Sequence, residues 1–203
     1  MTKSPVTLLV GTKNAHKLAE IRRLIAGLGV EVVDLSQFPN VPDAVEDGAT
    51  FEENGRAKAL HFADATGLLT VSDDSGLEVD ALGGAPGVYS ARFAGENADD
   101  EANNRRLMEK LAGVPEGKRT ARFRCVIALA SPGEVILTTE GAVEGRITDK
   151  PRGDYGFGYD PFFAPQGYEE TFGQLGSDVK DAISHRARAL ARFARRFEEY
   201  LRG

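Results

Sequence analysis

The chain has 203 residues and a formal net charge of −6, and at this length one ordinary domain buries a full hydrophobic core. Hydrophobic residues make up 41% and glycine contributes 23 residues, a composition typical of soluble globular proteins that excludes disordered and fibrous classes. A membrane-spanning helix needs about 20 apolar residues. The longest apolar run, from Cys125 to Ala130, has six.

Composition also restricts location and partners. The apolar stretch from Val6 to Val10 is shorter than the hydrophobic core of a secretory signal, so we expect a cytoplasmic protein without a membrane partner. Cys125 is the only cysteine, which excludes an internal disulfide and a C-x-x-C motif, and any metal is expected to have oxygen ligands. The acidic net charge argues against a nucleic acid polymer, whose binding needs clustered Lys and Arg.

The first third of the chain predicts alternating strands and helices. Thr7 to Gly11 is a short apolar run typical of a strand, and apolar residues spaced by three or four from Leu18 to Leu28 predict an amphipathic helix. Val30 to Leu35 predicts the next strand. Thr50-Phe-Glu-Glu53 is a capping box, which predicts a helix that continues to about Ala65.

The remainder of the chain adds a hairpin and two helices. Leu68 to Ser72 predicts a buried strand that stops at Asp73, and Asp99 to Leu111 predicts a helix. Alternating apolar residues from Ala121 to Ala130, followed by the turn Pro132-Gly133, predict a β-hairpin that continues through Glu134 to Val143. An apolar stripe from Ile183 to Leu201 predicts a C-terminal helix. We therefore expect an α/β fold with a mixed sheet, forming a single domain over residues 1–203.

The turn Thr12-Lys-Asn-Ala-His-Lys17 has two interpretations. The free amides and positive dipole end of a helix N-terminus hold phosphate well, with Lys13 or Lys17 supplying full charge. An ordinary capped helix with solvated lysines explains the same residues and, for this motif alone, is the stronger interpretation. The sequence is not a Walker P-loop.

Carboxylates form two pairs, Glu46 with Asp47 and Asp73 with Asp74. Closely placed carboxylates repel one another, and Mg²⁺ that bridges to phosphate oxygens relieves this repulsion. A turn or helix cap at Asp73-Asp74-Ser75-Gly76 and a solvated loop at Glu46 are equally good explanations from the sequence alone. Lys58, four residues after Asn54 on the predicted helix, is read either as a binding residue or as a solvated lysine.

Two further motifs follow in the C-terminal half. Gly156-Phe-Gly-Tyr-Asp-Pro-Phe-Phe163 carries four aromatic residues, which either stack on a base or bury their rings in a packed loop, and the packed loop is slightly favoured. Ser184-His-Arg186 opens the predicted C-terminal helix after Lys180. It offers hydrogen-bond donors to a cleft or forms an exposed basic turn.

Together these segments resemble the inosine triphosphate pyrophosphatase family over nearly the whole chain. The resemblance rests on the motifs above and on Gly83-Gly-Ala-Pro-Gly-Val-Tyr-Ser-Ala-Arg92. It implies an elongated mixed β-sheet with flanking helices, two lobes around a central nucleotide cleft and a homodimer. It also implies Mg²⁺-dependent hydrolysis of deaminated purine triphosphates (ITP, dITP, XTP) to the monophosphate and pyrophosphate.

The resemblance also assigns roles to residues. It makes Glu46 and Asp74 the ligands of Mg²⁺ and Asp74 the proton acceptor. The residues that it places against the substrate are Thr12, Lys13, Asn14, Ala15, His16, Lys17, Lys58, Ser75, Phe157, Gly158, Tyr159, Asp160, Lys180, His185 and Arg186. Of these, Thr12 to Lys17 and Lys58 are assigned to the triphosphate and Phe157 to Asp160 to the base.

Two other functions remain open from the sequence. A related pyrophosphatase acting on ordinary or methylated nucleotides would carry the same charged groups, and a substrate panel distinguishes it. A non-catalytic nucleotide sensor would not need Glu46 and Asp74 placed to hold a metal and activate water.

Overall fold

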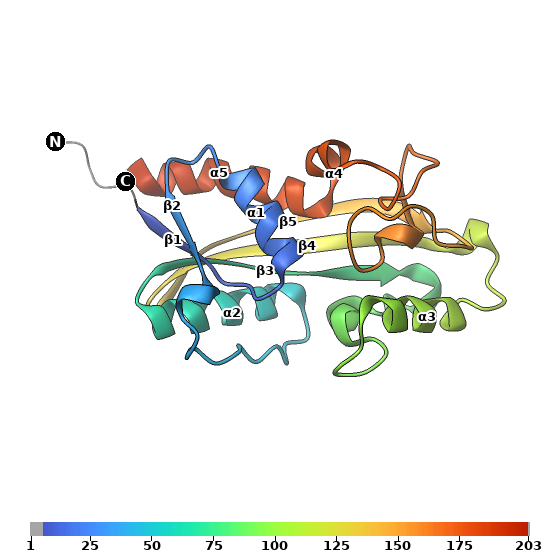
Figure 1. Ribbon diagram of the computed structural model, residues 1–203, viewed down its shortest axis with the longest axis horizontal. Helices are drawn as coiled ribbons and strands as arrows, with labels where there is room; N and C mark the ends of the chain where they lie inside the picture. The colour runs from blue at the N-terminus through green and yellow to red at the C-terminus, as the bar shows by residue number, and fades with distance from the viewer. Residues whose placement is uncertain (1–5, 203) are drawn as a thin grey trace. The chain divides into compact units, whose positions relative to one another are not determined.

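The computed structural model describes residues 6–202, which form six strands and five α-helices with short 3₁₀ turns. The strands are β1 (Thr7–Val10), β2 (Glu31–Asp34), β3 (Leu69–Val79), β4 (Thr120–Ser131), β5 (Glu134–Ile147) and β6 (Phe163–Pro165). The helices are α1 (Ala15–Ile25), α2 (Phe51–Thr66), α3 (Asp100–Lys110), α4 (Ser177–Ile183) and α5 (His185–Arg202). The strands lie in one sheet with the order β2-β1-β3-β4-β5-β6. β1 pairs in parallel with β2 and β3, and β5 pairs antiparallel with β6, so the predicted mixed sheet with flanking helices is confirmed (Figure 1).

The chain divides into two compact units. Unit 1 comprises residues 1–74, 126–140 and 188–203, and unit 2 comprises residues 75–125 and 141–187. The chain passes from unit 1 to unit 2 within β3, after Asp74, and returns to unit 1 within β4, after Cys125. The expectation of a single domain over residues 1–203 stays a prediction.

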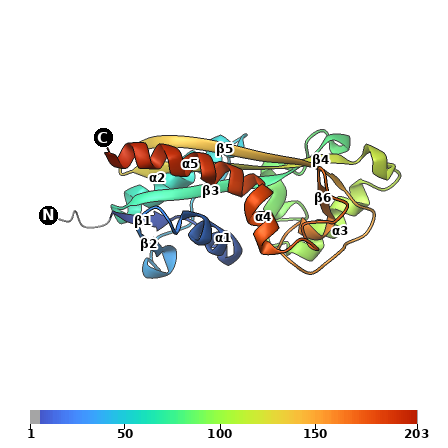
Figure 2. The ribbon, with the colours of Figure 1, turned by 90° about the horizontal axis from the view of Figure 1, so that it is seen from above.

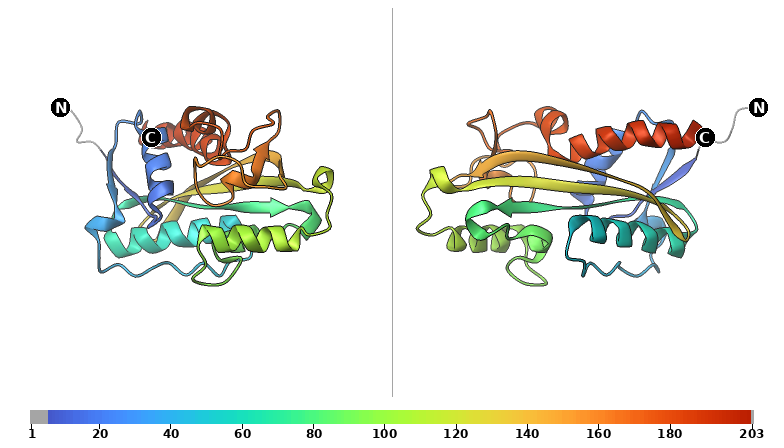
Figure 3. Two further views of the ribbon diagram at one scale, coloured as in Figure 1. Left: turned by 45° about the vertical axis from the view of Figure 1, so that its right-hand side comes forward. Right: turned by 180° about the vertical axis from the view of Figure 1, so that it is seen from behind.

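Unit 1 places helices on both faces of its strands. β1 lies next to β2 on one side and β3 on the other, as Figure 2 shows. α2 and the unit 1 part of α5 lie on opposite faces of this part of the sheet (Figure 3). Ala59 and Ala63 of α2 pack against Ala128 and Ala130 of β4, and these small side chains allow helix and strand to approach closely.

Unit 2 has an aromatic core of its own. Leu107 of α3 and Leu111, which follows the end of that helix, belong to a buried cluster that also contains Phe123 of β4 and Phe163 of β6. The rings of Phe123 and Phe163 are 4.6 Å apart between centroids. This cluster fixes α3 and the segment around β6 against the strands of unit 2.

The acidic motif lies inside a strand rather than at its end. β3 continues through Asp73-Asp74-Ser75-Gly76 to Val79, so the expectation that this strand stops at Ser72 is wrong, as is the turn or cap interpretation of the motif. The sequence pattern missed this because buried carboxylates interrupt an apolar run. Here Asp73 lies beside Lys17, which compensates its charge.

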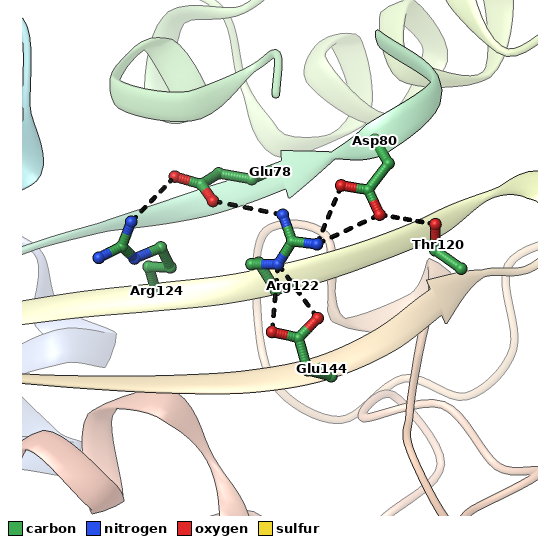
Figure 4. Close-up of polar contacts among 6 residues, drawn as sticks. All are labelled: Glu78, Asp80, Thr120, Arg122, Arg124 and Glu144. Atoms are coloured by element: carbon green, nitrogen blue, oxygen red, sulfur yellow. Dashed lines mark hydrogen bonds and ion pairs between the residues drawn. The ribbon is translucent and has the colours of Figure 1, made fainter. Parts of the chain in front are cut away.

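A charged network crosses three strands of unit 2 on one face of the sheet (Figure 4). Arg122 of β4 contacts three carboxylates: Asp80 at 2.9 Å, Glu144 of β5 at 3.1 Å and Glu78 of β3 at 3.7 Å. The hydrogen bond from the Thr120 hydroxyl and the contact with Arg122 lower the pKa of the Asp80 carboxyl. Single exposed ion pairs contribute little to stability, whereas a network of several charges around one guanidinium contributes more.

Candidate functional site

The first candidate site residues form a cluster in unit 1 that we call the acidic–lysine cluster: Lys17, Glu46, Lys58, Asp73 and Asp74. The Lys58 Nζ atom lies 2.7 Å from Glu46 Oε1 and donates to the main-chain oxygen of Asp73 at 3.4 Å. Lys17 Nζ lies 3.3 Å from Asp73 Oδ2. The charges of these four residues also act on the neighbouring Asp74, so α1, α2, β3 and one loop together contribute the five charged groups of the cluster.

The electrostatics of this cluster affect its two central groups in different ways. Burial raises the pKa of the Asp74 carboxyl, and the nearby charges of Glu46 and Asp73 raise it further, while Lys17 and Lys58 oppose the shift. Burial by itself would lower the pKa of Lys58, yet Glu46 and Asp73 outweigh it and the pKa is raised. Lys58 is therefore held as a cation, whereas Asp74 is a destabilised carboxylate with increased basicity.

The loop that carries Glu46 is tied to the start of α2. The amide N–H of Gly48 donates to Asn54 Oδ1 at 2.8 Å, and that of Ala49 donates to Glu53 Oε2 at 2.7 Å. A Cβ at position 48 would lie 2.7 Å from Asn54 Oδ1, so only glycine allows this approach. The predicted capping box is present, with the Glu53 N–H donating to Thr50 Oγ1 at 3.1 Å.

The turn before α1 forms the predicted helix cap. Asn14 Oδ1 accepts hydrogen bonds from the amides of His16 and Lys17, each at 3.0 Å. Thr12 is buried, and its hydroxyl accepts from the Asn14 amide at 3.2 Å. Of the two lysines of this turn, Lys17 is not solvated but joins the acidic–lysine cluster, whereas Lys13 pairs with Asp43 at the surface.

The donor set of this cluster fits a magnesium ion only in part. Within residues 6–202 no three acidic, His or Cys side chains converge in a way that could hold a metal without other ligands. Mg²⁺, however, is commonly held by one or two carboxylates together with substrate phosphate oxygens and water. Glu46 and the buried Asp74, whose mutual repulsion raises the pKa of Asp74, provide such a pair of hard oxygen donors.

The second group of candidate residues lies in unit 2, around the segment 156–160. Asp160 Oδ2 accepts hydrogen bonds from Lys180 Nζ at 2.6 Å and from the Phe157 amide at 2.9 Å. Lys180 Nζ also lies 4.7 Å from the centroid of the Phe157 ring. Of the four aromatic residues in the motif Gly156 to Phe163, Tyr159, Phe162 and Phe163 are buried, and Phe157 is partly exposed. The packed-loop interpretation therefore holds for three rings, and Phe157 is the one that can meet a ligand.

Two residues at the start of α5 contact the same unit. Arg186, buried in the protein, donates from Nη2 to Ser75 Oγ at 2.9 Å, and its guanidinium carbon lies 5.8 Å from the Phe157 ring centroid. His185 is also buried and stacks on Phe123, with ring centroids 4.8 Å apart. The exposed basic turn considered from the sequence is thus wrong, because α5 directs both side chains into the protein.

The structure does not bring every sequence-predicted residue into these contacts. Lys13, Ala15 and His16 are exposed on the first turn of α1 or just before it. The structure also shows contacts between the predicted site residues and residues to which the sequence analysis gave no role. Asp73 pairs with Lys17, and on α3 Asp100 and Asn104 contact Gly158. The four-residue spacing of Asp100 and Asn104 on a helix was the available signal, since it places both on one face.

Comparison with known proteins identifies the relatives of this chain. The model of the Ham1 family matches residues 8–196. The chain is 52% identical over 183 residues to a protein of Desulforamulus reducens named dITP/XTP pyrophosphatase, covering 90% of this chain and 91% of that one. A protein of Geobacter sulfurreducens with the same name is 52% identical over 184 residues, covering 91% of this chain and 92% of the relative.

Solved structures give the same result. A HAM1 protein from Coxiella burnetii superimposes with a TM-score of 0.86 at 40% identity, covering 96% of this chain and 99% of that structure. The structure of a nucleoside-triphosphatase / dITP/XTP pyrophosphatase from Mycobacterium abscessus gives a TM-score of 0.75 at 44% identity. The match covers 93% of this chain and 98% of that structure. The resemblance recognised in the sequence is thereby confirmed at the level of the family.

Replacing Asp74 by Asn is expected to stabilise the metal-free protein. Because the pKa of Asp74 is raised above its ordinary value of 3.8, the neutral carboxyl is favoured in the folded state. The neutral carboxyl contributes stability below pH 3.8, and this contribution is lost as the pH rises through the pKa of Asp74 in the folded state. At pH 7 with EDTA, D74N should therefore melt higher than the parent, by about 2–4 °C for each kcal/mol regained. This difference should shrink towards pH 3.

Asp73→Asn is the matched control for this melting experiment. It removes the carboxylate that compensates Lys17, so its melting temperature should fall at pH 7. A fall in D74N as large as that in D73N would contradict the assignment of Asp74 as the destabilised member of the pair.

Proposed function

The chain belongs to the Ham1 family, and on that premise we propose that it hydrolyses deaminated purine nucleoside triphosphates (ITP, dITP and XTP) to the monophosphate and pyrophosphate. It is then a nucleoside triphosphate pyrophosphatase, a hydrolase acting on acid anhydrides. The acidic–lysine cluster carries this proposal, because it combines a buried basic carboxylate with two lysines in one unit.

The lysines are suited to the triphosphate. Lys17 and Lys58 are both largely buried and both paired with carboxylates, so a polyphosphate competes for cations that are already in place. Thr12 to Lys17 form the turn at the N-terminus of α1, where the helix dipole favours negative charge. In this proposal Lys17 and Lys58 neutralise the charge that develops on the bridging oxygen as pyrophosphate leaves.

Glu46 and Asp74 are proposed to hold Mg²⁺ together with phosphate oxygens. When bound, the ion supplies positive charge against the phosphate oxygens. Glu46 Oε1 contacts Lys58, so this carboxylate would be shared between the lysine and the cation. The loop around Gly48, tied to Asn54, would keep Glu46 in place for both.

Asp74 is proposed as the proton acceptor. Water attacks the α-phosphorus, the bond from the α-phosphorus to the bridging oxygen breaks, and the water proton passes to the Asp74 carboxylate. Burial favours this role because it raises the pKa of Asp74 and so increases its basicity. Asp73, whose carboxylate pairs with Lys17, orients that lysine instead.

The residues of unit 2 are proposed to recognise the base. Phe157, partly exposed, offers a ring for stacking, and Lys180, His185 and Arg186 are hydrogen-bond donors of the same unit. Hypoxanthine and xanthine carry an acceptor oxygen at C6, where adenine carries an amino group, so donors favour the deaminated bases. Ser75, which accepts from Arg186, follows Asp74 directly in the chain and is proposed to touch the substrate.

A pyrophosphatase for ordinary or methylated nucleotides would need the same acidic–lysine cluster, and base preference separates it from the proposed enzyme. A non-catalytic sensor is disfavoured, because binding without turnover does not require a buried carboxylate with a raised pKa. We further propose that the protein is a cytoplasmic homodimer that binds no nucleic acid polymer. Within residues 6–202 no helix is both long and apolar enough to cross a bilayer.

The bond that is cleaved tests the proposed reaction. ITP should yield IMP and pyrophosphate in one step, because the cluster is proposed to act at the α-phosphorus. EDTA should abolish turnover and Mg²⁺ should restore it. The products are separated by ion-exchange chromatography, with pyrophosphate and orthophosphate assayed individually. IDP with orthophosphate as first products would refute the proposal.

The role of Asp74 is tested by steady-state kinetics with ITP. D74N should lower kcat by roughly 10² or more, the scale of losing a general base, and excess Mg²⁺ should not restore it. D73N should be less impaired in kcat, because its carboxylate only orients Lys17. If excess Mg²⁺ restored the kcat of D74N fully, Asp74 would be a metal ligand and not the proton acceptor.

Base choice is tested with ITP and ATP. Arg186→Ala should narrow the ITP-over-ATP ratio of kcat/KM, whereas Phe157→Ala should weaken both substrates alike, since every base has a π-face. Ser75→Ala is the control for the lost contact between Arg186 and Ser75. An unchanged ratio in both R186A and His185→Ala would place base selection in backbone groups of the segment 156–160.

A further inference from the structure

The loop 157–160 is held by side chains of α3, a helix to which no role has been assigned so far. The amide N–H of Gly158 donates to Asp100 Oδ2 at 2.6 Å. Asn104, one helical turn further on, donates from Nδ2 to the main-chain oxygen of Gly158 at 2.9 Å. One residue of the proposed base loop thus has both of its backbone polar groups bound by α3.

The other backbone groups of this loop are also engaged, with one exception. Phe157 N–H donates to Asp160 Oδ2, the Asp160 N–H donates to the main-chain oxygen of Phe157 at 3.3 Å, and the Tyr159 carbonyl accepts from Phe162. The N–H of Tyr159 has no acceptor among residues 6–202. It is therefore the loop amide that can donate to a ligand.

The Tyr159 N–H belongs to the same planar peptide unit as the Gly158 carbonyl. In a trans peptide these two groups point in opposite directions, and the only cis bond in residues 6–202 is Ala85–Pro86. When Asn104 binds the Gly158 carbonyl, it turns that carbonyl towards α3 and turns the Tyr159 N–H away from α3. Asn104 therefore sets the direction of the one amide that remains available.

Gly158 has a φ of 63°, a left-handed conformation that glycine adopts without strain, so the direction of this peptide unit depends on its anchors rather than on a side chain of Gly158. On the far side of the peptide unit, the Tyr159 hydroxyl donates to the main-chain oxygen of Ser90 at 2.8 Å inside the protein. The donor is thus fixed before any ligand arrives, which lowers the entropic cost of recognition.

We propose that Asn104 and Asp100 are positioning residues for base selection, which aim the Tyr159 N–H at an acceptor oxygen of the purine. This inference rests on the proposed function, because it deepens the choice of base. The ligand group is the C6 carbonyl oxygen of hypoxanthine or xanthine. Adenine presents an amino group at that position, which cannot accept from this N–H, so a fixed donor favours the deaminated base.

The experiment compares kcat/KM for ITP and ATP in the parent enzyme and in the α3 variants. Asn104→Ala should reduce the ITP-over-ATP ratio by about 5- to 10-fold, the scale of one neutral hydrogen bond, mainly through a higher KM for ITP. Asp100→Ala, an exposed position, should reduce it in the same direction without endangering the fold. Asp100→Asn keeps an acceptor oxygen and should restore most of the ratio.

Asn103→Ala is the matched control on the same helix. Asn103 is buried and bonds the main chain of Ala91 and Ala94 but not the base loop, so N103A should lower the melting temperature and leave the base ratio unchanged. A ratio that stays at the parental value in both N104A and D100A would overturn the inference. So would an equal loss of the ratio in N103A, because this would show a general structural effect.

The parent enzyme separates this failure from that of the proposed function. If the parent does not convert ITP to IMP and pyrophosphate, the proposed function fails and the premise of this inference with it. If the parent does so with a clear preference over ATP, the variants alone decide whether α3 positions the selecting amide.

Discussion

The buried ammonium group of Lys58 is the interaction on which the acidic–lysine cluster depends. It contacts the Glu46 carboxylate and the main-chain oxygen of Asp73, and its charge opposes the repulsion between Glu46 and Asp74. α2 supplies this lysine and, one turn earlier, Asn54, which ties down the loop that carries Glu46. α2 therefore holds Lys58 directly and, through Asn54, also holds the loop that carries Glu46. The direct contacts between these opposite charges offset the free-energy cost of burying them.

The adjacent residues Asp73 and Asp74 of β3 have different electrostatic environments. Successive side chains of a strand point to opposite faces, so Asp73 and Asp74 meet different surroundings although they are identical in type. Asp73 compensates Lys17, whereas Asp74 carries a raised pKa that costs stability and supplies basicity. Proteins commonly accept such a local cost at a functional position and offset it elsewhere.

In unit 2, selectivity is inferred to come from main-chain geometry as well as from charged side chains. Lys180 and Arg186, both buried beside Phe157, are proposed as side-chain donors to the base. A peptide unit held by Asn104 has a fixed direction and cannot adapt to the wrong hydrogen-bonding pattern. The α3 helix therefore links the aromatic core of unit 2, through Leu107, to the segment proposed to meet the base.

The sequence by itself determined the alternation of strands and helices up to β3, the capping box at Thr50, the hairpin at Pro132-Gly133 and the family, but it predicted neither β6 nor α4. These features depend on local periodicity and on motifs that neighbouring residues complete. Tertiary structure alone decided that β3 continues through Asp73, that Lys17 pairs with it, and that Asn104 reaches Gly158. The two contacts join residues more than 50 positions apart in the chain. The continuation of β3 places the Asp73 carboxylate inside the protein, which is favourable only because a lysine lies beside it. Such contacts arise only when the core brings distant segments together.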